Sequence, residues 1–199
     1  MRRTILLVAS MALTLLVASG VALAVTKIGT NGPDTLRGTN GDDNLVGKGG
    51  NDKLFSLAGD DNLLGGPGKD IVFGGNERFR YLGGDKNLLG GSGNDVVEGG
   101  KGSDNIVGGG GNDYLLDGFE LDPKKDTLSA GDGNDVLWVW NRPAGKDVVS
   151  CGSGLDRVFA DRDDLLAADC EEVFIGFDSL DEWVESIPES FWEGLNPRF

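Results

Sequence analysis

Residues 90–98 read Gly-Gly-Ser-Gly-Asn-Asp-Val-Val-Glu, and residues 108–116 read Gly-Gly-Gly-Gly-Asn-Asp-Tyr-Leu-Leu. Both contain Gly-x-Asp-x-apolar, and this pattern forms 13 units, most of them nine residues apart, from residue 32 to residue 158. All 13 units have an aliphatic residue two places after the acid position, and 12 have Asp at that position. Such a period is typical of stacked repeats that bury one continuous core together.

Each unit divides into a turn and a short strand. Six glycine-rich residues suit a tight turn, because glycine adopts positive φ without a Cβ penalty. The next three residues suit a strand whose middle residue faces inward. Two units then make one coil of 18 residues, and coils stack about 4.8 Å apart. The expected core is a thin aliphatic column: Leu36, Leu45, Leu54, Leu63, Val72, Leu88, Val97, Ile106, Leu115, Leu128, Leu137, Val149 and Val158.

Coiling also aligns the acidic residues. Asp34, Asp52 and Asp70 should line one edge, and Asp43 and Asp61 the other. Isolated Asx-turns would explain scattered aspartates but not two columns. Carboxylates about 5 Å apart repel unless a cation lies between them, and Ca²⁺ accepts oxygen ligands in flexible geometry, whereas Mg²⁺ demands an octahedron.

The sequence therefore predicts several calcium ions. The expected side-chain ligands are Asp34, Asp43, Asp52, Asp61, Asp70, Asp95, Asp104, Asp113, Asp126, Asp135, Asp147 and Asp156. The expected turn carbonyls are those of Gly32, Gly41, Gly50, Gly59, Gly68, Gly93, Gly102, Gly111, Gly133 and Gly154.

Over residues 29–159 the units resemble the RTX nonapeptide Gly-Gly-x-Gly-x-Asp-x-U-x, in which U is a large aliphatic residue. The resemblance implies an all-β, right-handed parallel β-roll, a β-solenoid with calcium in its turns. RTX-bearing proteases, lipases and epimerases carry a separate catalytic domain. Here the repeats and their ending occupy the chain, with no Gly-x-Ser-x-Gly or zinc motif. We expect no enzymatic activity.

Composition excludes other functions. The chain of 199 residues has 33 acidic and 18 basic residues, no histidine, 34 glycines and a net charge of -15. Without histidine there is no Ser-His-Asp triad and no histidine-ligated zinc. The negative charge also disfavours nucleic acid as a partner.

The N-terminal segment predicts export. Residues 1–24 have a basic start, an apolar run and an Ala-Leu-Ala end, which is typical of a cleaved signal peptide. An uncleaved membrane anchor is the alternative. With cleavage we expect a secreted protein of net charge -17, without a membrane span. In an oxidising compartment, Cys151 and Cys170 should form one disulfide.

The repeat is interrupted three times. Asp70 and Asp95 are 25 residues apart, and Lys86 stands at an acid position. If two short half-turns intervene, Lys86 falls between Asp70 and Asp104 in the column. If one half-turn and a loop intervene, the two edges exchange partners downstream, so that each later acid position joins the other upstream column. Lys86 is either a tethered cation or a solvated side chain. Residues 119–125 and 141–146 are further insertions, which carry positive charge.

The expected domains are the signal (1–24), the roll (25–159) and a cap (160–199). Residues 151–156, at the end of the roll, and residues 169–171, in the cap, resemble the Cys-Gly-x-Gly-x-Asp and Asp-Cys-Glu ending of secreted RTX-like proteins. Residues 179–187 predict a short amphipathic helix that covers the roll or docks a partner.

Large apolar residues at the last position of nine units should face outward: Val46, Phe55, Leu64, Phe73, Leu89, Val107, Leu116, Trp138 and Phe159. The leading hypothesis is a secreted protein that folds on binding calcium. The alternative is a calcium-stiffened extracellular adhesion or scaffold protein that binds a cell surface, a glycan or a protein through this outward stripe or through the C-terminal helix.

Overall fold

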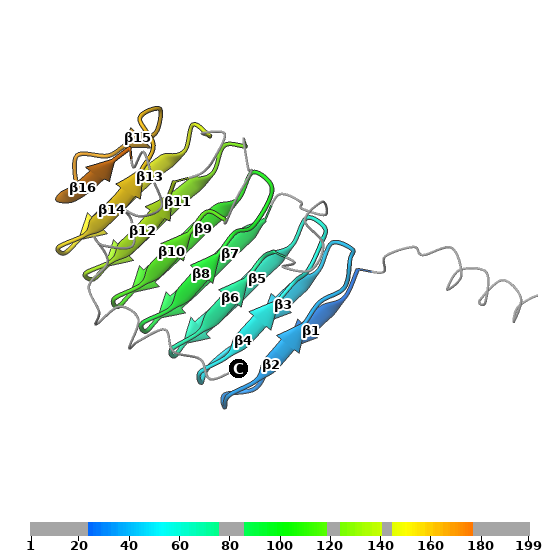
Figure 1. Ribbon diagram of the computed structural model, residues 1–199. Helices are drawn as coiled ribbons and strands as arrows, with labels where there is room; N and C mark the ends of the chain where they lie inside the picture. Colours follow the sequence, from blue (N-terminus) through cyan, green and yellow to red (C-terminus); the bar gives the residue numbers. More distant parts are fainter. Residues whose placement is uncertain (1–23, 76–85, 119–123, 141–144, 177–199) are drawn as a thin grey trace, which may run out of the picture.

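The computed structural model describes residues 24–75, 86–118, 124–140 and 145–176. Within these ranges the chain winds into a parallel β-solenoid, and its regular elements are all strands. Figure 1 shows the coils stacked in chain order, from β1 and β2 at the blue end to β15 and β16 at the orange end. The all-β repeat architecture predicted from the nine-residue period is confirmed.

The solenoid has two parallel sheets of eight strands each, and successive strands alternate between them. The first sheet contains β1 (Thr26–Ile28), β3 (Asn44–Val46), β5 (Asn62–Pro67), β7 (Asn87–Ser92), β9 (Asn105–Gly110), β11 (Thr127–Asp132), β13 (Val148–Ser153) and β15 (Leu165–Leu166). The second contains β2 (Thr35–Arg37), β4 (Lys53–Phe55), β6 (Ile71–Phe73), β8 (Val96–Glu98), β10 (Tyr114–Leu116), β12 (Val136–Val139), β14 (Arg157–Ala160) and β16 (Glu172–Ile175).

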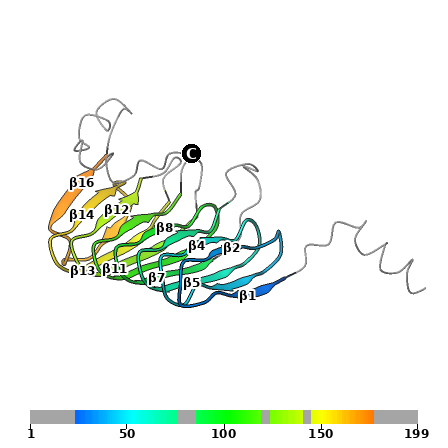
Figure 2. The ribbon, with the colours of Figure 1, turned by 90° about the horizontal axis from the view of Figure 1, so that it is seen from below.

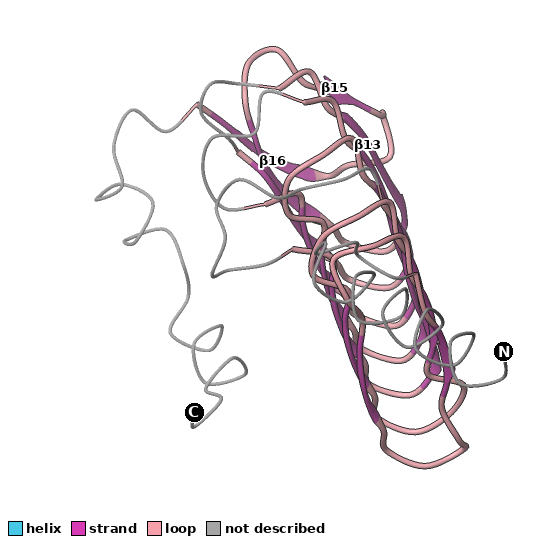
Figure 3. Ribbon diagram, turned by 90° about the vertical axis from the view of Figure 1, so that its right-hand side faces the viewer, coloured by secondary structure: helices cyan, strands magenta, loops and turns pink. Residues whose placement is uncertain are grey.

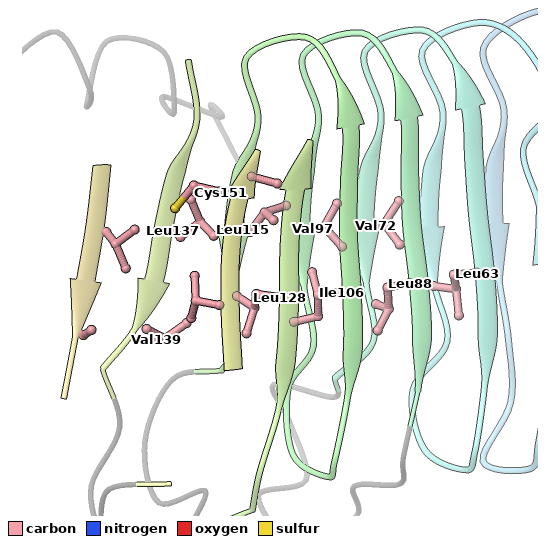
Figure 4. Packing of buried hydrophobic residues seen from close by; sticks show 14 of the residues in the cluster. Leu63, Val72, Leu88, Val97, Ile106, Leu115, Leu128, Leu137, Val139 and Cys151 are labelled. Atoms are coloured by element: carbon pink, nitrogen blue, oxygen red, sulfur yellow. The ribbon is translucent and has the colours of Figure 1, made fainter. Parts of the chain in front are cut away.

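The strand register keeps equivalent repeat positions above one another. In the first sheet Leu63 pairs with Leu88, and Leu88 with Ile106. Figure 4 shows these side chains in a row between the sheets. Twelve of the 13 predicted core residues are at most 1% exposed, and Leu36, in the first coil, is partly buried against the same cluster. One inward aliphatic residue per unit therefore forms the core, as predicted.

Two kinds of turn join the sheets, and Figure 3 shows them along opposite edges of the solenoid. We call the turns that lead from the first sheet to the second the first edge, and those that lead back the second edge. All three insertions lie in second-edge turns, between β6 and β7, β10 and β11, and β12 and β13. Figure 2 shows the strands of the two sheets from below, with β1, β5 and β7 in one sheet and β2, β4 and β8 in the other.

The interruption before Lys86 contains one half-turn with a lengthened connection. β6 pairs with β8, so Asp70 and Asp95 are neighbours on the first edge. β5 pairs with β7, and Lys86 therefore follows Asp61 and precedes Asp104 on the second edge. The arrangement with two half-turns, which would put Lys86 between Asp70 and Asp104, is wrong. The alternative arrangement is confirmed.

The sheets continue beyond residue 159. β15 pairs with β13 and β16 pairs with β14, so residues 165–175 complete a further coil. The predicted disulfide is present, with 5.2 Å between the Cα atoms of Cys151 and Cys170. The predicted signal lies almost entirely outside the described residues, and the helix at 179–187 lies entirely outside them. In the described part of the chain we find no helix that is long and apolar enough to cross a bilayer.

The apolar residues on the outer face of the second sheet form stacked pairs. The rings of Phe55 and Phe73 lie 5.6 Å apart, and Phe159 stacks on both Trp138 and Phe174. Phe159 is only 2% exposed, whereas Leu64, on the first sheet, is 39% exposed. The outward stripe is thus partly covered by its own members.

Candidate metal site

A ladder of aspartates runs along the first edge. The backbone N–H of each aspartate donates to Oδ1 of the aspartate in the next coil, at 2.7 to 2.8 Å. The ladder joins Asp34, Asp52, Asp70, Asp95, Asp113, Asp135 and Asp156. The predicted column is confirmed, and one carboxylate oxygen of each residue after Asp34 is satisfied by backbone.

The other carboxylate oxygen, Oδ2, is buried. Among the described residues it has no hydrogen-bond partner at six first-edge positions: Asp52, Asp70, Asp95, Asp113, Asp135 and Asp156. It faces the first residue of its own turn. A Cβ added to Gly65 would lie 2.5 Å from Asp70 Oδ2 and 2.5 Å from the carbonyl oxygen of Gly90. A carboxylate oxygen and a carbonyl oxygen therefore converge beside a glycine.

Burial makes these carboxyl groups resist ionisation. Desolvation raises the pKa of Asp95 and of Asp135 to about 6, and that of Asp113 to about 7. The carboxylates of Asp95 and Asp135, in the adjacent coils, contribute to the raised pKa of Asp113. A buried, partnerless anionic oxygen is costly, and a cation among the oxygens would offset that cost. The donor set, carboxylates and carbonyls without nitrogen or sulfur, fits calcium.

The first turn differs from the interior of the ladder. Asp34 is partly exposed, and its Oδ2 accepts hydrogen bonds from Thr30 N at 2.5 Å and from Thr30 Oγ1 at 2.9 Å. The backbone and hydroxyl of Thr30 lower the pKa of Asp34. The end of the ladder is therefore satisfied by protein atoms, whereas the interior is not.

The second edge carries a similar ladder with one exception. Asp43 N donates to Asp61 Oδ1, and the ladder resumes from Asp104 to Asp126 and Asp147 at 2.7 to 2.8 Å. Between the two segments Lys86 occupies the acid position and is 1% exposed. Desolvation raises the pKa of Asp61, and the charge of Lys86 is among the influences that lower it.

Eight of the ten glycines that were predicted to offer carbonyls have positive φ, and Gly32 and Gly41 do not. On the first edge the carbonyl oxygen of such a glycine lies against the equivalent glycine of the next coil, as Gly93 O does against Gly111. The carbonyls beside Oδ2 belong instead to the first residue of the following turn, such as Gly90 O beside Asp70. The ligand role of the ten glycines stays a prediction.

The sequence analysis missed the acids that complete both ladders. Asp156 N donates to Glu171 Oε2 at 3.1 Å, and Asp147 N donates to Asp164 Oδ1 at 3.1 Å. Burial raises the pKa of Asp164 to about 6. A signal was present, because Asp164 and Glu171 each stand two places before an apolar residue, as in the repeat. Only the glycines of the pattern are missing there.

A second ladder on the first edge was also missed. The residue before each ladder aspartate is often Asn, and its Oδ1 accepts the backbone N–H of the equivalent residue one coil later. Asn94, Asn112 and Asn134 make these bonds at 2.9 Å. They reinforce the turns from the solvent side of the aspartates.

Comparison with known proteins agrees with this geometry. The profile of the RTX calcium-binding nonapeptide repeat matches four times, over residues 28–63, 46–77, 83–115 and 123–140, which together are about half of the chain. A search of curated proteins gives no match. Both the aspartate ladders and these matches follow the same nine-residue unit, and the chain belongs to the RTX calcium-binding nonapeptide repeat family.

Proposed function

We propose that this chain is a secreted, non-enzymatic protein whose right-handed β-roll coordinates several Ca²⁺ ions and folds on binding them. The observation that carries the proposal is the row of six buried, partnerless Oδ2 atoms on the first edge. The first-edge aspartates, with carbonyls of the same turns, would hold the ions. Bound calcium would supply positive charge beside these buried oxygens, because the lysines of the described first-edge turns, Lys48 and Lys69, are exposed.

Coupling of calcium to folding follows from the small core. Each coil buries about two aliphatic side chains, whereas ordering a residue costs about 1–2 kcal/mol of backbone entropy. The sequence also carries a net charge of -15, which opposes compaction. A ligand that binds only the folded state adds its binding free energy to folding. Extracellular calcium modules bind at about 10⁻⁴ to 10⁻³ M, and we expect this range.

Secretion is supported by two independent features. The N-terminal segment has the pattern of a signal peptide, and the disulfide between Cys151 and Cys170 requires an oxidising compartment to persist. Mass spectrometry of the exported protein would test it: we expect an N-terminus after residue 24 and no free thiol. Retention of residues 1–24 would support the membrane anchor instead.

Circular dichroism during a calcium titration tests the central proposal, together with metal analysis of the dialysed protein. We expect a mostly disordered chain in chelator, a β spectrum in millimolar calcium, and several ions per chain. A β spectrum that a chelator leaves unchanged, or a protein without bound calcium, would contradict the proposal.

A pair of variants assigns the effect to the ladder. Asp113→Asn keeps an oxygen for the N–H of Asp95 but removes the buried charge. Asp132→Asn makes the same change at an exposed position of the following first-edge turn. We expect Asp113→Asn to lose an ion or raise the calcium midpoint by roughly tenfold or more, and Asp132→Asn to stay near the wild type.

The outer face of the second sheet favours adhesion or scaffolding as a second candidate. Phe174 ends the stacked aromatic group and is 38% exposed. Substitution of Phe174 by Ala should weaken binding of the calcium-loaded protein to cells or glycans if this face is used. Unchanged binding, with an unchanged spectrum, would leave calcium binding as the function without adhesion.

A further inference from the structure

The acid position of the second edge is occupied by lysine in the middle of the stack. Asp61 O accepts the N–H of Asn87, and Lys86 O accepts the N–H of Asn105. Lys86 N donates to Asp104 Oδ1 at 2.9 Å, as an aspartate N–H does elsewhere in the ladder. The backbone of Lys86 therefore makes the same ladder contacts as an aspartate, and only its side chain differs.

The Lys86 side chain fills the space that carboxylates occupy in other turns. A Cβ added to Gly74, the first residue of this turn, would lie 2.5 Å from Lys86 Cδ and 2.5 Å from the carbonyl oxygen of Gly99. The equivalent point beside Gly65 is 2.5 Å from Asp70 Oδ2 and 2.5 Å from Gly90 O. Lysine thus enters the same interior space, at 1% exposure, with Asp61 and Asp104 in the adjacent coils.

We propose that the ammonium of Lys86 is a built-in cation that replaces calcium between Asp61 and Asp104 on the second edge. This inference rests on the proposed function, because it concerns which intervals between stacked acid positions bind a calcium ion. A calcium ion beside Lys86 would face one carboxylate instead of two and a like charge, and both make binding unfavourable. The two intervals that flank Lys86 hold no calcium. Among the described residues Asp61 Oδ2 is buried and accepts no hydrogen bond. Lys86 therefore acts through the proximity of its charge, which opposes the rise in the pKa of Asp61 and offsets part of the two carboxylate charges at any calcium concentration.

The first edge has no equivalent of this substitution. Lys69 lies in a first-edge turn directly before the ladder aspartate Asp70, and it is exposed. Its N–H donates to Asn51 Oδ1, in the row of residues outside the aspartates. Lys69 is therefore a matched control: its substitution changes the charge equally at an exposed position outside the aspartate ladders.

The test counts calcium ions in Lys86→Asp, Lys69→Asp and the wild type, by metal analysis and calorimetric titration. We expect Lys86→Asp to bind one or two ions more than the wild type, because both flanking intervals become pairs of carboxylates. Lys69→Asp should bind the wild-type number. An equal number in Lys86→Asp and the wild type would overturn the inference. A wild type that binds no calcium would instead overturn the proposed function.

Lys86→Met provides a second measurement, which tests the inference even if Lys86→Asp does not fold. It removes the charge without supplying a ligand, so calcium cannot compensate. We expect the calcium midpoint for folding to rise about tenfold relative to Lys69→Met, because a buried charge loses its partner. A midpoint equal to that of Lys69→Met would overturn the inference.

Discussion

The two edges of the roll are built from one repeat, yet they differ in regularity. The first edge keeps an aspartate in every described turn from Asp34 to Asp156, and its Oδ2 atoms from Asp52 onward are buried without partners. The second edge has Lys86 at one acid position and takes all three insertions. The same nine-residue unit has thus produced an uninterrupted aspartate ladder on one side, and on the other side a ladder that contains a lysine and has lengthened turns.

Backbone pairing explains why the insertions are confined to one edge. β5, β7, β9, β11 and β13 are six residues long and extend into the first-edge turns, where Gly66, Gly91, Gly109, Gly131 and Gly152 continue the register. An insertion there would break these pairs. The strands of the second sheet are only three or four residues long, and their turns can lengthen without loss of sheet hydrogen bonds.

The largest effect is expected when a Cβ is forced into the first edge. Gly111 has φ of 125°, and its Cβ would collide with the carbonyl of Gly93. Gly111→Ala should lower the free energy of unfolding in calcium by about 3 kcal/mol or more, from positive φ and overpacking together. Gly110→Ala is the control, because no atom lies within 4 Å of its added Cβ. Equal unfolding midpoints for the two variants would show that the first edge is not tightly packed.

The disulfide gives the next effect, at the C-terminal end of the same edge. Cys151 is fully buried at the first position of the first-edge turn that leads to β14, where most turns have glycine, and Cys170 is 19 residues away. The double variant Cys151→Ser, Cys170→Ser should lose about 3 kcal/mol, in agreement with loop-closure entropy. Chemical denaturation in calcium measures the loss, with the reduced wild type as control. A loss below about 0.5 kcal/mol would mean that the last coil closes without the bridge.

A smaller effect is expected from pH, with opposite signs in chelator and in calcium. Burial raises the pKa of Asp95, Asp113 and Asp135 from about 4 to about 6 or 7, and carboxylates of the adjacent coils face them. These groups bind protons on folding. Their contribution to stability is therefore present below about pH 4 and is lost as the pH rises through 6 to 7.

In chelator we thus expect more β structure at pH 4.5 than at pH 7.5. Calcium requires ionised carboxylates, so in calcium the order is reversed. Circular dichroism at both pH values, with and without calcium, measures this. Asp163→Asn, which changes an exposed acid outside the ladders, should follow the wild type. The same order of stability in both conditions would contradict the assignment of the ladder carboxyls as the titrating groups.

The smallest effect concerns the asparagine ladder. Asn112 donates its N–H to Asn94 Oδ1 and accepts from the N–H of Asn134. Asn112→Ala removes one acceptor at a solvent-exposed position, and about 1 kcal/mol of stability should be lost. Lys69→Ala, at the equivalent position of another turn, should change the stability little. If the two variants have equal unfolding midpoints, the asparagine hydrogen bonds are a result of the turn geometry and do not stabilise the protein.

Much of the fold could be predicted from the sequence, because the period of nine specifies both the inward residue and the turn. Leu63, Leu88 and Ile106 stack as expected, and so do the aspartates. The edge of Lys86 could not be predicted, because a spacing of 25 residues fits either one long or two short half-turns. The last coil was missed because Asp164 and Glu171 keep the acid and apolar positions without the glycines.

The confinement of insertions to second-edge turns has a consequence for protein engineering. Neighbouring aspartates of the first edge are 18, 25, 22 or 21 residues apart in sequence, yet each pair is joined by the same hydrogen bond of 2.7 to 2.8 Å. The chain thus already carries guest segments of several lengths without disturbing the opposite side. A peptide grafted into the regular second-edge turn between β4 and β5 should therefore leave the hydrogen bonds of the first edge unchanged.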